Sequence, residues 1–262
     1  MIRGLYTSAL GMTTQMQRMD VVSNNIANVN TVGFKRDAVA AQEFSHRLSV
    51  RINDPTQANS VFRLMLNNGI GFLNQGVFID EVFTDFRSGG IRETAGPLDV
   101  ALTDTGFFAI TTINNDGSET EVFSRDGSFT MGADGTLLDM AGGRVQGQGG
   151  GDIVLPVGII TIDETGQIFV NNEYVDTLRM VNFSNLESLR KTRGSYWIAT
   201  PESEQIDFTG SVMQGFLENS NVNAVTEMVE LVALSRAYEA NSRMVQIHDE
   251  TLGRAVNEIA RR

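Results

Sequence analysis

The stretch MVELVALSRAYEANSRMVQIHDETLGRAVNEI, residues 228–259, carries a large apolar or aromatic side chain at every seventh position, and no proline interrupts it. Side chains seven residues apart lie on one face of a helix, and a stripe of them forms the seam of a coiled coil. The sequence therefore predicts one long helix, about residues 222–260, that packs this seam against another helix. The repeat consists of Leu231, Tyr238, Val245, Leu252 and Ile259.

The residues around this repeat complete the helical pattern. Ser220 or Asn221 can cap the first turn by accepting hydrogen bonds from free backbone N–H groups, and Glu227 follows where the helix dipole favours negative charge. The intermediate seam positions hold Met228, Leu234, Asn241, His248 and Ala255.

The N-terminal segment, about residues 2–29, carries a similar stripe whose members alternate at steps of three and four. Gly4 and Gly11 each weaken a helix by up to ~1 kcal/mol, so this helix needs a packing partner. We expect its assembly seam to be built mainly from five apolar residues. The full stripe is Ile2, Leu5, Ala9, Met12, Met16, Met19, Ser23 and Ile26, and the five are Leu5, Met12, Met16, Met19 and Ile26.

The middle of the chain, about residues 75–218, has the composition of short β-strands. Runs such as residues 106–113 and 159–162 are rich in β-branched and aromatic side chains. Turn signals separate the runs, and an Asp-Gly pair between such runs predicts a hairpin. These signals are Asp116-Gly117, Asp126-Gly127, Asp134-Gly135 and Thr165-Gly166. Residues 37–74 are compatible with either helix or strand, including Phe62–Leu66 and Phe72-Leu73.

These zones predict an α+β protein in which N- and C-terminal helices form a coiled-coil layer and a central all-β domain is inserted between them. We expect residues 1–36 and 219–262 to form the terminal assembly domain. Residues 37–74 would connect it to a β domain of residues 75–218. Burying both stripes requires the termini to pair with each other or with other copies of the chain.

The composition excludes several functions. The net charge of −12 and a sequence pI near 4.6 disfavour binding to nucleic acid or to anionic lipid, and no segment has the ~20 apolar residues that span a membrane. There is no cysteine, and the two histidines, His46 and His248, are far apart, so we expect no metal site and no cofactor. The carboxylates show no catalytic spacing.

Two loops resemble ligand-binding motifs only superficially. The glycine-rich residues 142–152 lack the Gly-Lys-Ser/Thr ending of a phosphate-binding loop, which favours a mobile surface loop. Residues 114–119 contain Asn and Asp but lack the spacing of a calcium loop, which favours a hairpin turn.

Four stretches, in order along nearly the whole chain, resemble the flagellar rod, hook and hook-associated protein family. The first has the family's asparagines followed by Gly-Phe-Lys: Asn24, Asn25, Asn28, Gly33, Phe34 and Lys35. The others are residues 98–108, residues 124–129 with 134–137, and residues 217–223 with 227–229 and 236–242. The asparagines can satisfy the end of the first helix locally, bond to a neighbouring subunit's backbone, or do both. Gly33 is expected to supply a positive φ or a close backbone approach.

This resemblance implies a structural subunit of the flagellar basal-body rod, not an enzyme. Its terminal helices would line a tube, its β domain would lie outside, and the assembly would act as the drive shaft between motor and hook. The implied partners are other copies in a helical or tubular homo-oligomer, neighbouring rod proteins, the hook protein and the flagellar type III export apparatus. The implied location is the extracytoplasmic part of the basal body, reached without a cleaved signal peptide.

Within the family, the chain's length favours a rod subunit over a hook subunit, and we expect the distal rather than the proximal rod type. A proximal rod or hook-type subunit is the alternative within the family. From a different class, the alternative is an envelope β domain that binds or cleaves carbohydrate. Cleavage would require two carboxylates about 5–10 Å apart across a cleft.

Overall fold

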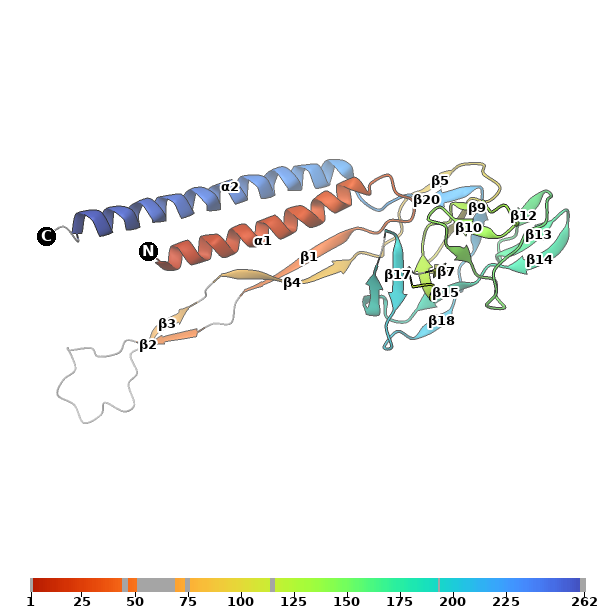
Figure 1. Ribbon diagram of the computed structural model, residues 1–262, viewed down its shortest axis with the longest axis horizontal. Coiled ribbons are helices and arrows are strands. Elements are labelled where there is room, and N and C mark those ends of the chain that lie inside the picture. The colour runs from red at the N-terminus through yellow and green to blue at the C-terminus, as the bar shows by residue number, and fades with distance from the viewer. Residues whose placement is uncertain are drawn as a thin grey trace, which may run out of the picture. The chain divides into compact units, whose positions relative to one another are not determined.

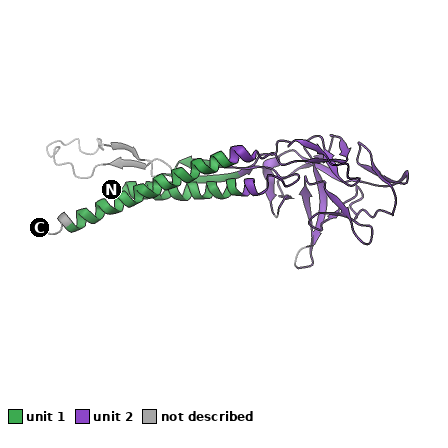
Figure 2. Ribbon diagram, turned by 90° about the horizontal axis from the view of Figure 1, so that it is seen from above, with its two compact units in different colours: residues 1–23, 39–82, 228–262 green, residues 24–38, 83–227 purple. Residues whose placement is uncertain are grey.

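The structure, a computed structural model, describes residues 2–43, 47–50, 69–73, 76–113, 116–192 and 194–259. The chain divides into two compact units, coloured separately in Figure 2. The helical unit comprises Met1–Ser23, Val39–Val82 and Met228–Arg262, and the β unit comprises Asn24–Ala38 and Phe83–Glu227. These limits differ from those expected for the assembly domain, the connecting segment and the β domain, and that functional division stays a prediction.

Two long helices begin and end the described chain (Figure 1). Helix α1 spans Ile2–Ala27, and α2 spans Ala224–Arg254 and continues as a π-helical turn, Ala255–Ile259. The predicted caps of α2 were wrong. Asn223 caps the helix instead, because its Oδ1 accepts hydrogen bonds from the backbone N–H groups of Val225 and Thr226 at 3.1 and 3.2 Å.

The two helices lie side by side and antiparallel in the helical unit (Figures 1 and 2). The imidazole of His248 on α2 lies directly over Gly4 of α1, and the amide of Asn241 lies over Gly11. The glycines therefore do more than weaken the helix, since the missing side chains leave room for larger ones on α2. A second neighbour of α1 is strand β4, whose Val77 carbonyl accepts a hydrogen bond from the Thr14 hydroxyl at 3.0 Å.

Apart from Gly76, residues 37–84 form strands wherever they are described. Two antiparallel ladders are present, β1 with β4 and β2 with β3. Phe72-Leu73 lies in a strand, whereas Phe62–Leu66 and His46 lie outside the described residues. The strands are β1 (Asp37–Glu43), β2 (Arg47–Val50), β3 (Gly69–Leu73) and β4 (Val77–Thr84).

The β unit is built from antiparallel sheets, which together with the helices confirms the predicted α+β class. Among the described residues, the largest sheet has nine strands, in the order β16-β17-β8-β7-β11-β10-β9, with β15 paired to β7 and β18 to β15. Its strands are β7 (Phe107–Ile113), β8 (Glu119–Ser124), β9 (Phe129–Met131), β10 (Leu137–Asp139), β11 (Arg144–Val145), β15 (Met180–Phe183), β16 (Leu189–Lys191), β17 (Tyr196–Ala199) and β18 (Gln205–Asp207).

Smaller sheets complete the β unit. A three-stranded sheet has the order β12-β13-β14, and two ladders join β19 to β6 and β20 to β5. These strands are β5 (Ile91–Glu93), β6 (Val100–Leu102), β12 (Ile160–Ile162), β13 (Gln167–Val170), β14 (Glu173–Thr177), β19 (Val212–Gln214) and β20 (Phe216–Glu218). A short 3₁₀ turn, Leu186–Ser188, precedes β16.

The β unit buries a substantial apolar core. One cluster includes Phe108, Leu137 and Ile168, each fully buried. A second cluster surrounds Trp197, the single tryptophan, whose ring packs against Phe107 with centroids 5.4 Å apart. Burial of this many large apolar side chains gives the β unit its own hydrophobic stabilisation.

Three of the four predicted turns connect paired strands. Asp116-Gly117, Asp134-Gly135 and Thr165-Gly166 join antiparallel neighbours, and their glycines have positive φ. Asp126-Gly127 is different, because β8 and β9 do not pair. Gly127 is instead a point of close approach, where a Cβ atom would lie 1.8 Å from the carbonyl oxygen of Val100.

The glycine-rich residues 142–152 form a compact turn and not a phosphate-binding loop followed by a helix. Strand β11 occupies its start, Gln146 bridges Asp152, and the Gly147 N–H donates to the Gly151 carbonyl at 2.8 Å. Other backbone groups of this segment pair with neighbouring strands, since the N–H groups of Gln146 and Gln148 donate to the carbonyls of Ala109 and Thr177 at 3.0 and 2.8 Å.

Candidate functional site

The chain segments that enter and leave the terminal helices meet inside the β unit. We call this region the Glu218 junction: residues 24–38, 85–90, 125 and 217–227. It contains the last residues of α1, the start of α2 and the end of β20. Four segments far apart in sequence are thus held by one set of hydrogen bonds.

Glu218 lies at the centre of the junction and is 2% exposed. Its Oε1 accepts hydrogen bonds from Lys35 Nζ and the Gly89 N–H, both at 2.7 Å, and its Oε2 accepts from Arg125 Nε at 2.5 Å. A buried carboxylate is tolerated only when charges and hydrogen bonds compensate its lost hydration. Glu218 satisfies this condition by binding two cations.

The two cations are equally well enclosed. Lys35, 2% exposed, also donates to the Arg87 carbonyl at 2.9 Å. Arg125, 4% exposed, also donates to the Gly106 carbonyl at 2.5 Å. Because Arg125 follows β8 and Lys35 follows α1, the cluster ties the nine-stranded sheet to the segment leaving α1.

Burial and charge shift the pKa values of this cluster in identifiable ways. Burial alone would raise the pKa of Glu218, but Arg125 and Lys35 outweigh it and hold this pKa below its ordinary value. Burial lowers the pKa of Lys35, and the attraction of Glu218 offsets only part of that effect. Glu218 is therefore held as a carboxylate, which is the form that accepts all three hydrogen bonds.

A second hydrogen-bond set surrounds Asn25, which is fully buried. Its Nδ2 donates to the Asp37 carbonyl at 2.8 Å and to Glu227 Oε2 at 3.3 Å, and its Oδ1 accepts from the Asp37 N–H at 3.0 Å. Glu227, 1% exposed, also pairs with Arg36 Nε at 2.5 Å. Asn25 thus joins α1 to the start of α2 within one chain.

The neighbouring asparagines of the predicted motif have other roles. Asn28 donates its Nδ2 hydrogen to the Asn24 carbonyl at 2.8 Å, which closes the end of α1 locally. Asn24 itself is exposed. The expected local role at the end of the helix therefore describes Asn28, whereas Asn25 bonds to Asp37 and to the distant Glu227. A bond from these asparagines to a neighbouring subunit stays a prediction.

Gly33 and Phe34 fit the segment between α1 and β1 closely against the β unit. Gly33 has φ of 66°, and a Cβ atom there would lie 2.5 Å from the Arg125 carbonyl carbon. Both expectations for this glycine, a positive φ and a close approach, are therefore met. Phe34 is 2% exposed, and Lys191 Nζ lies 4.0 Å from its ring centroid while also pairing with Asp37 at 2.8 Å.

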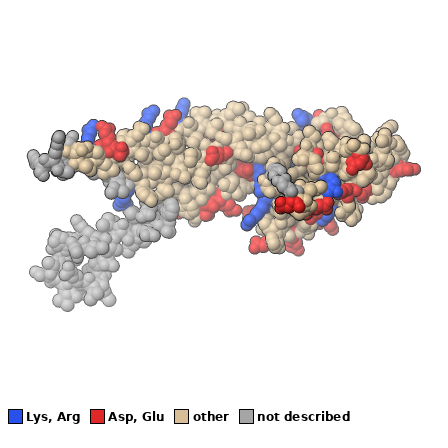
Figure 3. Space-filling model, in the orientation of Figure 1, with Lys and Arg blue, Asp and Glu red and all other residues tan. Residues whose placement is uncertain are grey.

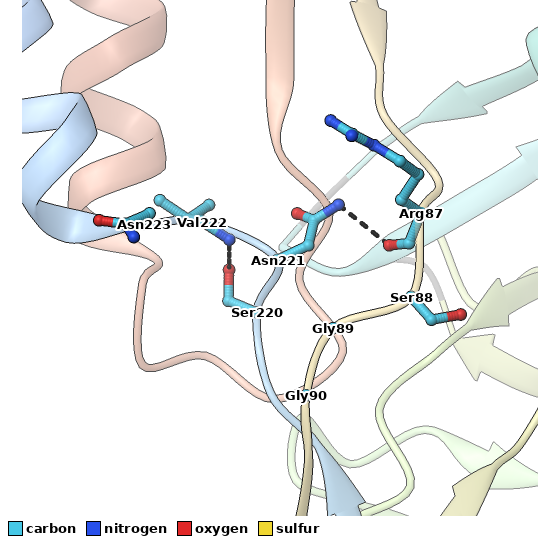
Figure 4. A pocket seen from close by; sticks show the side chains of 8 residues that line it. All are labelled: Arg87, Ser88, Gly89, Gly90, Ser220, Asn221, Val222 and Asn223. Atoms are coloured by element: carbon cyan, nitrogen blue, oxygen red, sulfur yellow. Dashed lines mark hydrogen bonds between the residues drawn. The ribbon is translucent and has the colours of Figure 1, made fainter.

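Asn221 completes the junction beside a shallow hollow of about 440 Å³, drawn in Figure 4. Its Oδ1 accepts from the Arg36 N–H at 2.8 Å, and its Nδ2 donates to the carbonyls of Asp85 and Arg87 at 2.8 and 3.0 Å. Asn221 therefore links the backbone that follows α1 to the backbone of residues 85–87. Its lining residues are Arg87, Ser88, Gly89, Gly90, Ser220, Asn221, Val222 and Asn223.

Sequence reasoning named part of this junction and missed the rest. Asn25, Gly33, Phe34 and Lys35 were expected as motif residues, and the structure brings them together. Their partners at the junction are Arg125, Glu218, Asn221 and Glu227. Arg125 and Glu218 were not singled out, although both lie in stretches that carried the family resemblance. Asn221 and Glu227 were named, but only as a possible cap and as an acidic residue favoured by the helix dipole.

The ten expected assembly residues lie on the two helices and not at the junction. On α1, Leu5, Met12, Met19 and Ile26 are half-buried and Met16 is 49% exposed. On α2, Leu231, Tyr238, Val245 and Leu252 are half-buried, and Ile259 lies in the π-helical turn. Their part in assembly stays a prediction.

This arrangement defines a class: an α+β protein with a long helix at each end of the chain and antiparallel sheets between them, in which residues 24–27 of α1 and 224–227 of α2 belong to the β unit. Among the described residues there is no group of three His, Asp or Glu side chains placed to hold a metal ion. None of the helices in the described part of the chain is long and apolar enough to cross a membrane.

Comparison with known proteins identifies the family. Residues 5–35 match the family described as flagella basal body rod protein, residues 101–170 match the flagellar hook protein FlgE/F/G D1 domain, and residues 213–258 match the flagellar basal body rod FlgEFG protein C-terminal region. All three matches follow the order of the stretches noted in the sequence.

Full-length relatives agree with these matches. The flagellar basal-body rod protein FlgG of Borreliella burgdorferi is 32% identical, with 98% of each chain covered. FlgG of Agrobacterium fabrum is also 32% identical, over 95% of this chain and 96% of that protein, and FlgF of Caulobacter vibrioides is 27% identical over essentially both chains. The chain belongs to the flagellar basal-body rod protein family, whose members are structural and not enzymatic.

Proposed function

We propose that this chain is a FlgG-like subunit that assembles through α1 and α2 into the shaft of the flagellar rod and transmits torque from motor to hook. The observation that carries this proposal is the apolar surface on both helices. Met16, Val229, Val232 and Ile247 are 49%, 66%, 53% and 54% exposed in the single chain. Exposed apolar side chains repeated along a helix pair favour burial against other subunits.

The Glu218 junction supports a mechanical role. Torque can pass between the terminal helices and the β unit only if their connections resist bending. Within the β unit, the buried charge pairs at Glu218 and the Asn25 hydrogen bonds join the last turn of α1, the first turn of α2 and the neighbouring strands. A set of fully compensated buried polar groups specifies one arrangement, because alternatives would leave a charge unpaired.

The finer assignment is the distal rod, in the extracytoplasmic part of the basal body. It rests on the similarity to FlgG proteins over nearly the whole chain. The proposed partners are further copies of this chain, neighbouring rod proteins, the hook protein and, during export, the flagellar export apparatus. A proximal rod or hook-type position is the alternative.

Quantitative mass spectrometry of purified hook–basal bodies tests the proposal. We expect many copies of this chain per basal body, and the ratio to hook protein separates a distal from a proximal position. Absence from intact basal bodies would overturn it.

A deletion gives a second test. Removing residues 2–19 should abolish motility and incorporation while the β unit stays folded, since residues 24–38 belong to that unit. A deleted chain that still enters the rod would contradict assembly through α1.

A further inference from the structure

Helix α1 carries two different stripes along its length, and only one of them faces α2. Gly4 and Gly11 point at His248 and Asn241. Each step forward along α1 is matched by an equal step back along α2, which defines an antiparallel register. The buried contact of Asn25 with Glu227 in the β unit follows the same register. The α2-facing stripe is therefore Gly4, Ser8, Gly11, Gln15, Arg18, Val22 and Asn25, and it is small or polar at most positions.

The apolar stripe of α1 points elsewhere. We call Leu5, Met12, Met16 and Met19 the methionine stripe. At 3.6 residues per turn, its centre lies about 90° around the helix from the α2-facing stripe.

Strand β4 does not cover the methionine stripe either. Thr14, which donates to the Val77 carbonyl, lies about 80° from the α2-facing stripe in the opposite direction. Among the described residues of the helical unit, α2 and β4 therefore cover two sides of α1, and the methionine stripe lies on a third side. Met16 is 49% exposed, and the flanking Ala9 and Ser23 are exposed as well.

Helix α2 has a matching uncovered side. Leu234, Asn241 and His248 lie on the side toward α1, and Leu234 is buried. Val229, Val232 and Ile247 lie roughly opposite to them around the helix, and more than half of each side chain is exposed. We call these three residues the outer side of α2.

The distribution of charge indicates which part of a second copy can approach. The residue ranges of the helical unit contain ten arginines and ten acidic residues, so its net charge is zero. The β unit has ten basic and 22 acidic residues and carries the whole net charge of −12. On the face drawn in Figure 3, charges of both signs are interspersed along the helical unit and acidic groups are numerous over the β unit. Two helical units can therefore pack without net repulsion, whereas two β units repel each other.

We propose that the methionine stripe of α1 is covered by the outer side of α2 from a second copy of this chain. The α2-facing stripe then serves packing within one copy, and the methionine stripe serves packing between copies. This inference rests on the proposed function and adds to it the two helix faces that meet. Methionine suits such a contact because its flexible, polarisable side chain adapts to a partner surface.

Cross-linking from single cysteines tests this assignment, because the chain has no native cysteine. Met16→Cys, labelled with benzophenone maleimide, is irradiated in basal bodies from cells that express nitrogen-14 and nitrogen-15 forms of the full chain. We expect mixed-isotope adducts between residue 16 and peptides containing Val229, Val232 or Ile247. The matched control, Ser8→Cys on the α2-facing stripe, should give adducts to α2 of the same isotope.

The outcomes separate this inference from the proposed function. If basal bodies contain the chain but Met16→Cys gives adducts only within its own copy, with a β unit or with another protein, the assignment of faces is wrong and the rod role stands. If the unaltered chain is absent from basal bodies, the proposed function itself fails.

A second pair of variants covers the case in which the labelled protein does not assemble. Met16→Lys should reduce incorporation into basal bodies at least tenfold, with unchanged helix content by circular dichroism. Gln17→Lys places the same charge one residue away, on an exposed position outside the stripe, and should incorporate normally. Equal incorporation of the two variants would overturn the inference.

Discussion

Replacing Glu218 by glutamine isolates the charge at the centre of the junction. Glutamine keeps the size of the side chain and one acceptor oxygen, so Lys35 and the Gly89 N–H can still be bound. Its NH₂ group would then face Arg125 Nε, which now meets the Oε2 atom at 2.5 Å. The variant therefore leaves Arg125 and Lys35 as two buried cations without a carboxylate.

The expected loss in the free energy of unfolding is about 3–5 kcal/mol, the usual cost of leaving a buried charge without its partner. With a urea slope of about 2 kcal/mol per molar, the unfolding midpoint should fall by roughly 2 M. Trp197 reports this transition directly, because it is the single tryptophan, is fully buried and lies in the β unit.

Glu121→Gln is the matched control. Glu121 pairs with Arg179 at 2.6 Å, but both side chains are about one-third exposed. Such a pair contributes at most about 1 kcal/mol, so the midpoint should move by less than about 0.5 M. If Glu218→Gln, folded by circular dichroism, shifted the midpoint no more than Glu121→Gln, the reasoning about the junction would be refuted.

Three further predictions follow from the same contacts. Since its pKa is lowered in the fold, the Glu218 carboxylate stabilises the β unit fully above its ordinary pKa of 4.5. That stabilisation is lost as pH falls through the lowered pKa. Below pH 4.5, the urea midpoint of the natural chain should therefore fall more steeply with decreasing pH than the midpoint of Glu218→Gln. Gly33→Ala should destabilise the β unit by more than ~1 kcal/mol in the same urea assay, because φ is 66° and the new Cβ atom would meet Arg125; a neutral result would contradict the close approach. Gly11→Leu should separate α1 from α2 and speed limited proteolysis of α1, whereas Gly253→Ala, in open space on α2, should raise helix stability by up to ~1 kcal/mol; similar proteolysis rates for both variants would disprove the packing role of Gly11.

Local periodicity was sufficient to predict the elements of this fold. A seven-residue repeat specifies a helix with one apolar seam, and β-branched runs between Asp-Gly turns specify hairpins, because both depend on neighbours close in sequence. The two helices and most turns were predicted for this reason. The hairpin predicted at Asp126-Gly127 was wrong, because the glycine is required by the close approach of Val100, a residue 27 positions away, and not by a local turn.

The functional junction depended on contacts that no spacing reveals. Lys35 meets Glu218 across 183 residues, and Asn25 meets Glu227 across 202. The motif positions Asn25, Gly33 and Lys35 could be named from family resemblance, but a charge that is buried and paired looks in sequence like any charge on a surface.

The sequence by itself therefore determined that the chain has a helix with an apolar stripe at each end, a β unit between them, and membership of a rod protein family. Only the tertiary structure decided which stripe of α1 faces α2. The glycines at 4 and 11 allow close approach of His248 and Asn241, and this close approach turns the methionine stripe away from α2. The face of α1 that meets α2 is thus decided by steric fit between side chains distant in sequence. The hydrophobic pattern alone does not decide it, because any apolar partner can cover an apolar stripe.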